Sequence, residues 1–225
     1  MGASFRLMTA NLLNGRAEWP DVASIIDRHR PEIVVVQEMG PDIAPVLAAR
    51  YPYHHLHPAE DHEGYGMASS YQAVFDTIPL SWRWIVWGRH LIEGRSVLVA
   101  TTHMRNPVKF PWWTSARLRR EQIEAVESWT EREVGDRPAV LAGDMNSSPA
   151  WPLYDRLTER WDDVVADAAR SAGTKPDPTW GWRPGWPRML RIDHVLGRGI
   201  WAKSTIVEPV RGSDHAAVVV DLELG

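Results

Sequence analysis

Two oxygen-bearing side chains, Asp144 and Asn146, lie two positions apart after the apolar run 139–142, which predicts a buried strand. Side chains alternate along a strand, so residues two positions apart are expected to face the same way. Carboxylate and amide oxygens are hard ligands that suit Mg²⁺ or Mn²⁺, and these ions in turn suit phosphate substrates. The pattern therefore predicts an oxygen-rich site where this strand ends and the chain turns at residues 147–149.

Further polar signatures occur at the ends of other apolar segments. In chain order they are Asn11, Glu38, His103, the pair Asp193-His194 and the pair Asp214-His215. One polar residue at the tip of an apolar strand is ordinary, and a solvated or structural role is the usual explanation. A series of Asn, Glu, His, Asp-x-Asn, Asp and Asp-His in one chain instead favours a shared site.

The stretches that carry these residues resemble the motifs of the endonuclease/exonuclease/phosphatase superfamily, also called DNase I-like. They are residues 9–15, 35–38, 102–104, 143–149, 191–195 and 213–216. The resemblance spans nearly the whole chain. It implies an α/β (α+β type) fold, a four-layer sandwich in which two mixed β-sheets lie face to face with helices outside. It also implies a metal-dependent phosphoric ester hydrolase with Mg²⁺ (or Mn²⁺) as its cofactor.

The resemblance also implies a metal-binding set. Glu38 and Asn11 match the positions that hold the catalytic cation, which agrees with the cost of leaving a carboxylate unpaired behind four aliphatic residues. Asp214 matches a carboxylate beside the metal, bound directly or through water. Asp144 and Asn146 are further candidate oxygen ligands.

The catalytic roles combine this resemblance with local chemistry. A histidine acts best as a general base when a carboxylate fixes its tautomer and stabilises the imidazolium. His215 is the candidate base, and Asp193 matches the supporting carboxylate. Asp144 is expected to orient or deprotonate the attacking water, and Asn146 to bind a phosphate oxygen. His103 matches a histidine that contacts the phosphate and protonates the leaving group.

Proline and apolar spacing locate the main elements. A helix that Pro20 opens, with Val22, Ile25 and Ile26 on one buried face, precedes the strand carrying Glu38. A longer helix over about 114–133 precedes the strand that ends near 144. Segment 82–87 and the strand leading to residue 103 predict a hairpin between these helices.

Length and composition limit the classes of protein to which the chain can belong. The 225 residues suffice for one domain, residues 1–225, with its own core. No cysteine is present, which excludes disulfides and thiolate metal sites, and no signal segment or membrane-spanning run is visible, so a cytoplasmic protein is expected. The net charge of −4 does not favour long duplex DNA, which proteins usually grip through a basic face, although nucleic acid remains an open partner.

Two segments are candidates for specificity. Segment 53–63 is rich in histidine and acidic residues, but its spacing fits no metal template and favours a polar surface loop. The thirteen tryptophans gather in part in two loops, with the candidate substrate-binding residues Trp112, Trp113, Trp182, Arg183 and Trp186. Tryptophan with arginine offers a stacking surface for a nucleobase or an apolar wall for a hydrophobic leaving group. Packing of these aromatic side chains onto the domain is the alternative.

The sequence thus predicts a metal-dependent phosphodiesterase that hydrolyses a small or aromatic-containing phosphoester by attack of water. A fold alone does not fix the substrate, so a nuclease acting on DNA or RNA is the first alternative. The second is an inactive binding module with the same fold. Some nuclease relatives carry an acidic residue where Leu13 stands, which argues against a full second cation there. Monoester or diester preference, ion number and oligomeric state stay open.

Overall fold

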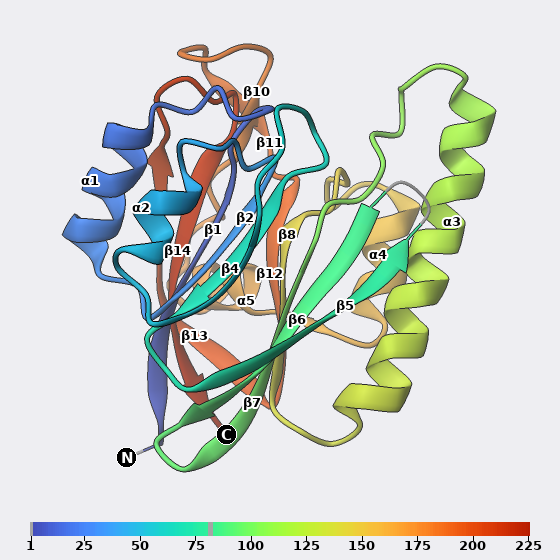
Figure 1. Ribbon diagram of the computed structural model, residues 1–225. Coiled ribbons are helices and arrows are strands. Elements are labelled where there is room, and N and C mark those ends of the chain that lie inside the picture. The colour runs from blue at the N-terminus through green and yellow to red at the C-terminus, as the bar shows by residue number, and fades with distance from the viewer. Residues whose placement is uncertain (1, 81–82) are drawn as a thin grey trace.

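Two six-stranded β-sheets lie face to face, and helices cover their outer faces (Figure 1). This computed structural model describes residues 2–80 and 83–225. The arrangement confirms the predicted α/β (α+β type) four-layer sandwich. Both chain termini lie at one end of the sandwich, and the loops that close β1, β2, β7 and β8 gather toward the other end.

The first sheet is mixed. Its spatial order is β13 (Ile200–Pro209), β14 (Ala216–Leu224), β1 (Ser4–Asn11), β2 (Ile33–Gln37), β4 (Tyr65–Ser69) and β3 (Tyr53–His57). β1 runs parallel to β2 and antiparallel to β14. All of β2 is buried, since it lies between two strands with both faces covered, and this explains its continuous aliphatic run.

The second sheet is mixed as well. Its order is β5 (Ala73–Leu80), β6 (Arg83–Ile92), β7 (Arg95–Thr102), β8 (Ala139–Asp144), β12 (Asp193–Arg198) and β9 (Asp162–Asp163). β6 and β7 pair antiparallel, which confirms the predicted hairpin, although its first predicted residue, Trp82, lies outside the described residues. A separate small hairpin joins β10 (Trp180–Gly181) to β11 (Arg188–Leu190).

The helices complete the outer layers. α1 (Trp19–His29) and α2 (Ala44–Ala48) cover the first sheet, while α3 (Trp112–Trp129) and α4 (Pro152–Thr158) cover the second. The predicted helix over 114–133 is therefore α3 extended by the π-helical turn η1 (Thr130–Val134). α5 (Val164–Ser171) packs against β12 and β13. Among the described residues, no helix has the length and apolarity needed to cross a bilayer.

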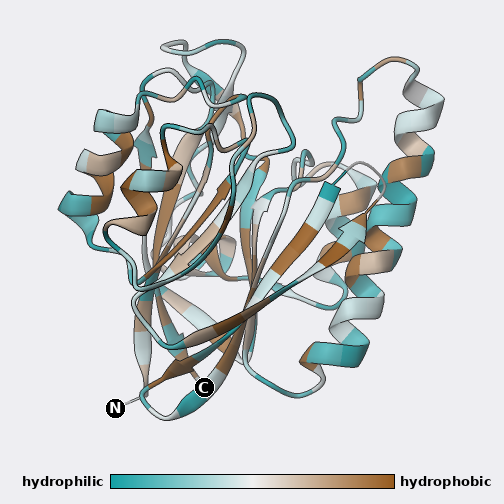
Figure 2. Ribbon diagram, in the orientation of Figure 1, coloured by the Kyte–Doolittle hydropathy of each residue, from teal (hydrophilic) through white to brown (hydrophobic). Residues whose placement is uncertain are grey.

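Three apolar layers hold the sandwich together. The central layer between the sheets includes Leu7, Val35 and Val140, all fully buried. A second layer joins the first sheet to α1 through residues such as Ile25, and a third joins the second sheet to α3 through residues such as Trp129. Figure 2 shows the hydrophobic residues on the strands and on the helix faces turned toward them. Each buried aliphatic side chain contributes about 1.5–3 kcal/mol.

The histidine-rich segment corrects one prediction. Residues 53–57 are not a loop but strand β3, which pairs antiparallel with β4 and places His55 opposite Met67. The ring of His57 stacks on Tyr65 at a centroid distance of 5.0 Å. The aromatic and aliphatic partners on β4 favour a strand here, because cross-strand side-chain contacts stabilise pairing even for an edge rich in polar residues. The polar segment that follows β3 remains a loop.

Candidate active site

The first sheet brings Asn11, Glu38 and His215 to one end of the sandwich. Parallel pairing places Asn11 opposite Gln37, the residue before Glu38. β14 begins directly after His215 and lies on the other side of β1. The Ser213 hydroxyl donates to the Asn11 carbonyl oxygen at 2.7 Å and accepts from the His215 backbone N–H at 3.1 Å. These bonds fix the loop that carries His215 against the end of β1.

The second sheet supplies the facing groups. Antiparallel pairing of β8 and β12 sets Asp144 directly opposite Asp193. His103 follows the last residue of β7, which runs parallel to β8. Beneath them the buried Gln37 amide of the first sheet donates to the Thr101 hydroxyl of the second at 2.8 Å. This bond holds the two sheet ends at a fixed separation under the site.

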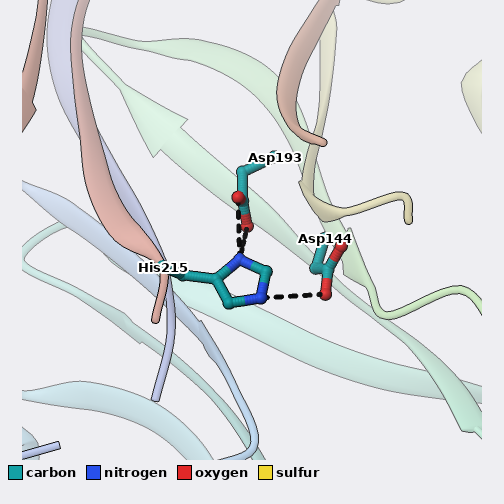
Figure 3. A group of neighbouring side chains, drawn as sticks. All are labelled: Asp144, Asp193 and His215. Carbon is teal, nitrogen blue, oxygen red and sulfur yellow. Dashed lines mark hydrogen bonds and ion pairs between the residues drawn. The ribbon is translucent and has the colours of Figure 1, made fainter. Parts of the chain in front are cut away.

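His215 lies between two carboxylates (Figure 3). Its Nδ1 is 2.9 Å from Asp193 Oδ2, and its Nε2 is 3.8 Å from Asp144 Oδ2. The three residues are at most 7% exposed. The Asp193 carboxylate can only accept a hydrogen bond, so His215 Nδ1 carries the proton of this bond. Nε2 then faces Asp144 and the cleft. The predicted pairing of His215 with Asp193 is thus present in the geometry.

Asn11, Glu38 and His103 complete the cluster. Asn11 Nδ2 donates to Asp144 Oδ2 at 2.9 Å and lies 3.3 Å from Glu38 Oε1. His103 Nε2 lies 3.4 Å from Asp144 Oδ2 and 3.6 Å from Glu38 Oε1. The residues predicted separately as metal ligands and as catalytic groups therefore form one site, with Asp144 at its centre.

Asp214 lies beside this cluster and is held by an aromatic residue. Its Oδ2 accepts a hydrogen bond from the Trp180 indole N–H at 3.0 Å, and its Oδ1 lies 4.0 Å from His215 Nε2. Oδ1 is buried and has no hydrogen-bond partner in the described chain. A buried carboxylate oxygen without a donor is unfavourable unless a cation or a donor from a ligand meets it.

Asn146 joins the site in a way that differs from the prediction. β8 ends at Asp144, and Asn146 follows it with a φ of 45°, so strand alternation does not bring the two together. Instead the chain turns back. The Asn146 backbone N–H donates to Asp144 Oδ1 at 2.8 Å, and its Nδ2 donates to Asp144 Oδ2 at 3.1 Å and to the Met104 carbonyl at 3.0 Å. Asn146 therefore orients the Asp144 carboxylate.

Gly143 makes this tight approach feasible. Its φ is 142°, and a Cβ there would lie 2.3 Å from the carbonyl oxygen of Thr102. Both conditions restrict the position to glycine, because an L side chain would be strained in this conformation and would also collide with β7. The glycine before Asp144 is thus required by the close packing of β8 on β7.

The electrostatics of the cluster follow from its burial. Burial alone would lower the pKa of His215, but the charges of Asp193 and Asp144 raise it to about 10. Burial raises the pKa of Asp144 to about 7, while the charge of His215 limits the rise. Burial, together with the positive charges of Arg83 and His215, holds the pKa of His103 well below its usual range. The buried carboxylates thus stabilise positive charge on His215.

The donor set fits a hard divalent cation. The carboxylates of Glu38, Asp144 and Asp214 line one cleft, and the unpartnered Asp214 oxygen is the kind of group such an ion would satisfy. Ligand atoms of Asp144, Asp193 and His215 also lie within 4.8 Å of one another. Both Asp193 oxygens of this triad face His215 Nδ1, at 3.1 and 2.9 Å, so Asp193 serves the histidine rather than an ion. The predicted ligands of the ion are Glu38, Asp144 and Asp214, with Asn11 beside the first two.

A cleft of about 500 Å³ opens over this cluster. Glu38, His103, Asp144, Asn146 and His215 all line it. Its lining also includes apolar side chains, namely Trp151, Trp180, Trp182, Leu190 and Ile192, and several cationic side chains. A second hollow of about 280 Å³ shares Asp214 and His215 with the cleft.

The predicted aromatic residues divide between these features. Trp182 lines the cleft and is 63% exposed. Arg183 and Trp186 line the second hollow, where the Arg183 guanidinium lies over the Trp186 ring at 5.6 Å. Trp113 is not among the residues that line either space, and it packs edge-on against Phe110 at 5.7 Å. The side chain of Trp112, the first residue of α3, lies outside the described part of the structure.

Sequence reasoning missed several residues of the cleft. Trp180 donates a hydrogen bond to Asp214, but in the sequence it is only one member of a tryptophan-rich run. Arg83, Arg105 and Lys109 also line the cleft. The proximity of Arg105 to His103 in the chain was an available signal, whereas Arg83 comes from the start of β6 and gives no sign in the sequence. His194, which carries no predicted role, donates from Nε2 to the Ser147 carbonyl oxygen at 2.7 Å and is structural.

Comparison with known proteins agrees with this geometry. The family model described as the endonuclease/exonuclease/phosphatase family matches residues 8–215. No curated protein matches the sequence. Among solved structures, an endonuclease/exonuclease/phosphatase from Beutenbergia cavernae superimposes with a TM-score of 0.77 at 22% identity, over 99% of this chain and 72% of that one.

Two further solved structures share the fold at low identity. The human nocturnin catalytic domain with bound sulfate gives a TM-score of 0.76 at 16% identity, over 100% of this chain and 96% of that one. D. rerio TDP2 complexed with a single-strand DNA product gives 0.74 at 15% identity, over 98% and 99%. With a family model spanning nearly all of the sequence and a sandwich that gathers the family motifs at one end, the chain belongs to the endonuclease/exonuclease/phosphatase family.

Proposed function

We propose that this chain is a divalent-metal-dependent phosphodiesterase that hydrolyses a small or aromatic-containing phosphoester. The observation that carries the proposal is the His215 ring held between Asp193 and Asp144, at 2.9 and 3.8 Å, beside the Glu38 carboxylate. A cation bound by the oxygen ligands would neutralise the phosphate and acidify water. The sulfate in nocturnin and the DNA product in TDP2 are consistent with a family site for phosphate groups.

The reaction needs a water oxygen to attack phosphorus while the bond from phosphorus to the leaving oxygen breaks. The water proton passes to the Asp144 carboxylate, whose Oδ2 lies 3.8 Å from His215 Nε2. Asp193 stabilises the imidazolium of His215, since its oxygens lie within 3.1 Å of Nδ1. The leaving oxygen takes a proton from water in the cleft, because the lowered pKa of His103 keeps that ring neutral and able to offer only a hydrogen bond.

Specificity for an aromatic group rests on the wall of the cleft. Trp180 and Trp182 pack edge-on at 6.1 Å and present an aromatic face beside Asp214. Stacking on such a face contributes about 1–3 kcal/mol per base or ring. The aromatic part of the substrate would lie here while its phosphoester lies over Asp144.

A nuclease is the second candidate, and one observation favours it. The second hollow is lined by Arg183, Arg188 and Arg211 and reaches the same His215. Two spaces that meet at one catalytic histidine would suit a nucleic-acid strand that continues past the site. Local basic residues can offset the net charge of −4. The inactive binding module predicts loss of an essential position, and each matched position is retained.

The test is supercoiled-plasmid nicking and small-diester hydrolysis measured side by side in Mg²⁺ at low salt. His215→Ala, purified identically, controls for contaminating nucleases. Hydrolysis of bis(p-nitrophenyl) phosphate with intact plasmid supports the first candidate, and nicking by the wild type alone supports the nuclease. Absence of both activities with Mg²⁺ or Mn²⁺ bound contradicts the proposed function and favours the binding module.

A further inference from the structure

One wall of the catalytic cleft is cationic, although the chain carries a net charge of −4. Arg83, Arg105 and Lys109 line this wall on the side of His103, together with His62. The pKa of His62 is lowered by burial first and then by the charges of Arg83 and Lys109, which agrees with their closeness in space.

Several arginines of the molecule form ion pairs with carboxylates, as Arg156 does with Glu127 at 2.6 Å and Arg191 with Asp163 at 2.7 Å. Within residues 2–80 and 83–225, Arg105 and Lys109 form no ion pair with a carboxylate, and Arg105 Nε is buried without a hydrogen-bond partner. A half-buried guanidinium without an acceptor is unfavourable, so an anion supplied by a ligand would satisfy it.

The loop that carries these cations is fixed rather than loosely attached. The Arg105 backbone N–H donates to Gln122 Oε1 of α3 at 2.8 Å, and its carbonyl accepts from the Arg119 side chain. The Ser115 hydroxyl of α3 donates to the Asn106 carbonyl. These contacts hold Arg105 in place before any ligand arrives, and such preorganisation reduces the entropy lost on binding.

Arg83 connects this wall to the catalytic centre. Burial lowers the pKa of Arg83, while the charges of Glu38 and Asp144 raise it, so its guanidinium lies near both carboxylates. Arg105 and Lys109 follow His103 by two and six residues and line the same cleft. The cleft therefore holds cationic side chains in addition to the groups around Asp144.

We propose that Arg105 and Lys109 form a second anion subsite, so that the substrate is a nucleotide-like phosphodiester carrying an additional phosphate. The scissile phosphoester lies over Asp144 and His215, the ring lies against Trp182, and the additional phosphate binds Arg105 and Lys109. This assignment rests on the proposed phosphodiesterase function for the position of the scissile group. It adds one requirement to that function, which is that the substrate carries a second charge at a fixed position.

The test compares two chromogenic diesters that differ in one phosphate. They are thymidine 5′-(p-nitrophenyl phosphate) and the same compound with a 3′-phosphate, and both release p-nitrophenol. We expect the wild type to favour the 3′-phosphorylated substrate in kcat/KM by at least about tenfold, as two charge-assisted contacts allow. In Arg105→Gln/Lys109→Gln this ratio should fall toward one. The matched control is Arg132→Gln/Arg137→Gln, which removes the same charge from η1 and the turn after it and should keep the wild-type ratio.

The outcomes separate the subsite from the catalytic proposal. If the double variant loses activity equally on both substrates, the cations serve the scissile phosphate alone and the second subsite is refuted. A wild-type ratio near one refutes it as well. If the wild type hydrolyses neither compound, calorimetric binding of thymidine 3′,5′-bisphosphate against thymidine 5′-monophosphate still tests the subsite. Preference for the bisphosphate that is lost in Arg105→Gln/Lys109→Gln retains it, and equal binding overturns it.

Discussion

His90 makes a sharp prediction about stability in acid. It lies on β6 with no exposed surface, and its Nδ1 is 3.0 Å from the hydroxyl of Ser69 on β4 of the facing sheet. Its Nε2 is buried without a hydrogen-bond partner among the described residues. Burial lowers the pKa of His90 from 6.5 to about 4, so the ring is neutral in the folded protein over most of the acid range.

The sign of the effect follows from proton binding. Between pH 6.5 and about 4 the unfolded chain protonates this histidine and the folded chain does not, so stability falls as the pH falls through that window. Each pH unit in the window is worth about 1.4 kcal/mol, which gives a loss of about 3 kcal/mol by pH 4. Such a loss is a large fraction of the stability of an ordinary domain.

Urea unfolding at a series of pH values from 7 to 4.5, followed by tryptophan fluorescence, measures this loss. His90→Gln keeps a group that can bond to Ser69 but does not titrate, so its stability should fall with pH by about 2–3 kcal/mol less than that of the wild type. His57→Gln, on the exposed side of β3, is the matched control and should follow the wild type. Parallel curves for the wild type and His90→Gln would refute the reasoning.

Three further predictions concern activity and packing. His215→Ala and Asp144→Asn should each lower kcat by at least about 100-fold while circular dichroism stays native, and near-native turnover in either would remove its assigned role. Trp182→Ala should raise the KM for bis(p-nitrophenyl) phosphate by about tenfold more than that for methyl p-nitrophenyl phosphate, whereas equal changes would indicate a packing role only. Trp129→Ala should lower the free energy of unfolding by about 3–5 kcal/mol, because its fully buried ring stacks on Trp161 at 6.0 Å, and a loss below about 1 kcal/mol in urea unfolding would contradict this.

The strand-end pattern predicted the cluster well because topology enforces it. Asn11 and Glu38 end neighbouring parallel strands, and Asp144 and Asp193 lie opposite each other on paired strands. Aliphatic runs and prolines likewise located α1 and the strand before Glu38, since these signals are local.

The remaining features depend on contacts that a linear pattern does not contain. Asn146 reaches Asp144 through a left-handed turn rather than through strand alternation. Segment 53–57 forms a strand because it pairs with β4, although its polar composition is typical of a loop. Arg83 reaches the cleft from the start of β6. It lies near Glu38 because the two sheets pack face to face. Long-range packing of this kind sets the cleft wall and therefore the specificity.

Hydrolysis of bis(p-nitrophenyl) phosphate by the wild type, with and without Mg²⁺ or Mn²⁺, beside His215→Ala is the most direct test of the central claim. We expect release of p-nitrophenol that requires the ion, is abolished by EDTA, returns when the ion is restored, and falls at least about 100-fold in the variant. Hydrolysis that is indifferent to EDTA or equal in His215→Ala would contradict the claim that this carboxylate and histidine cluster performs the chemistry.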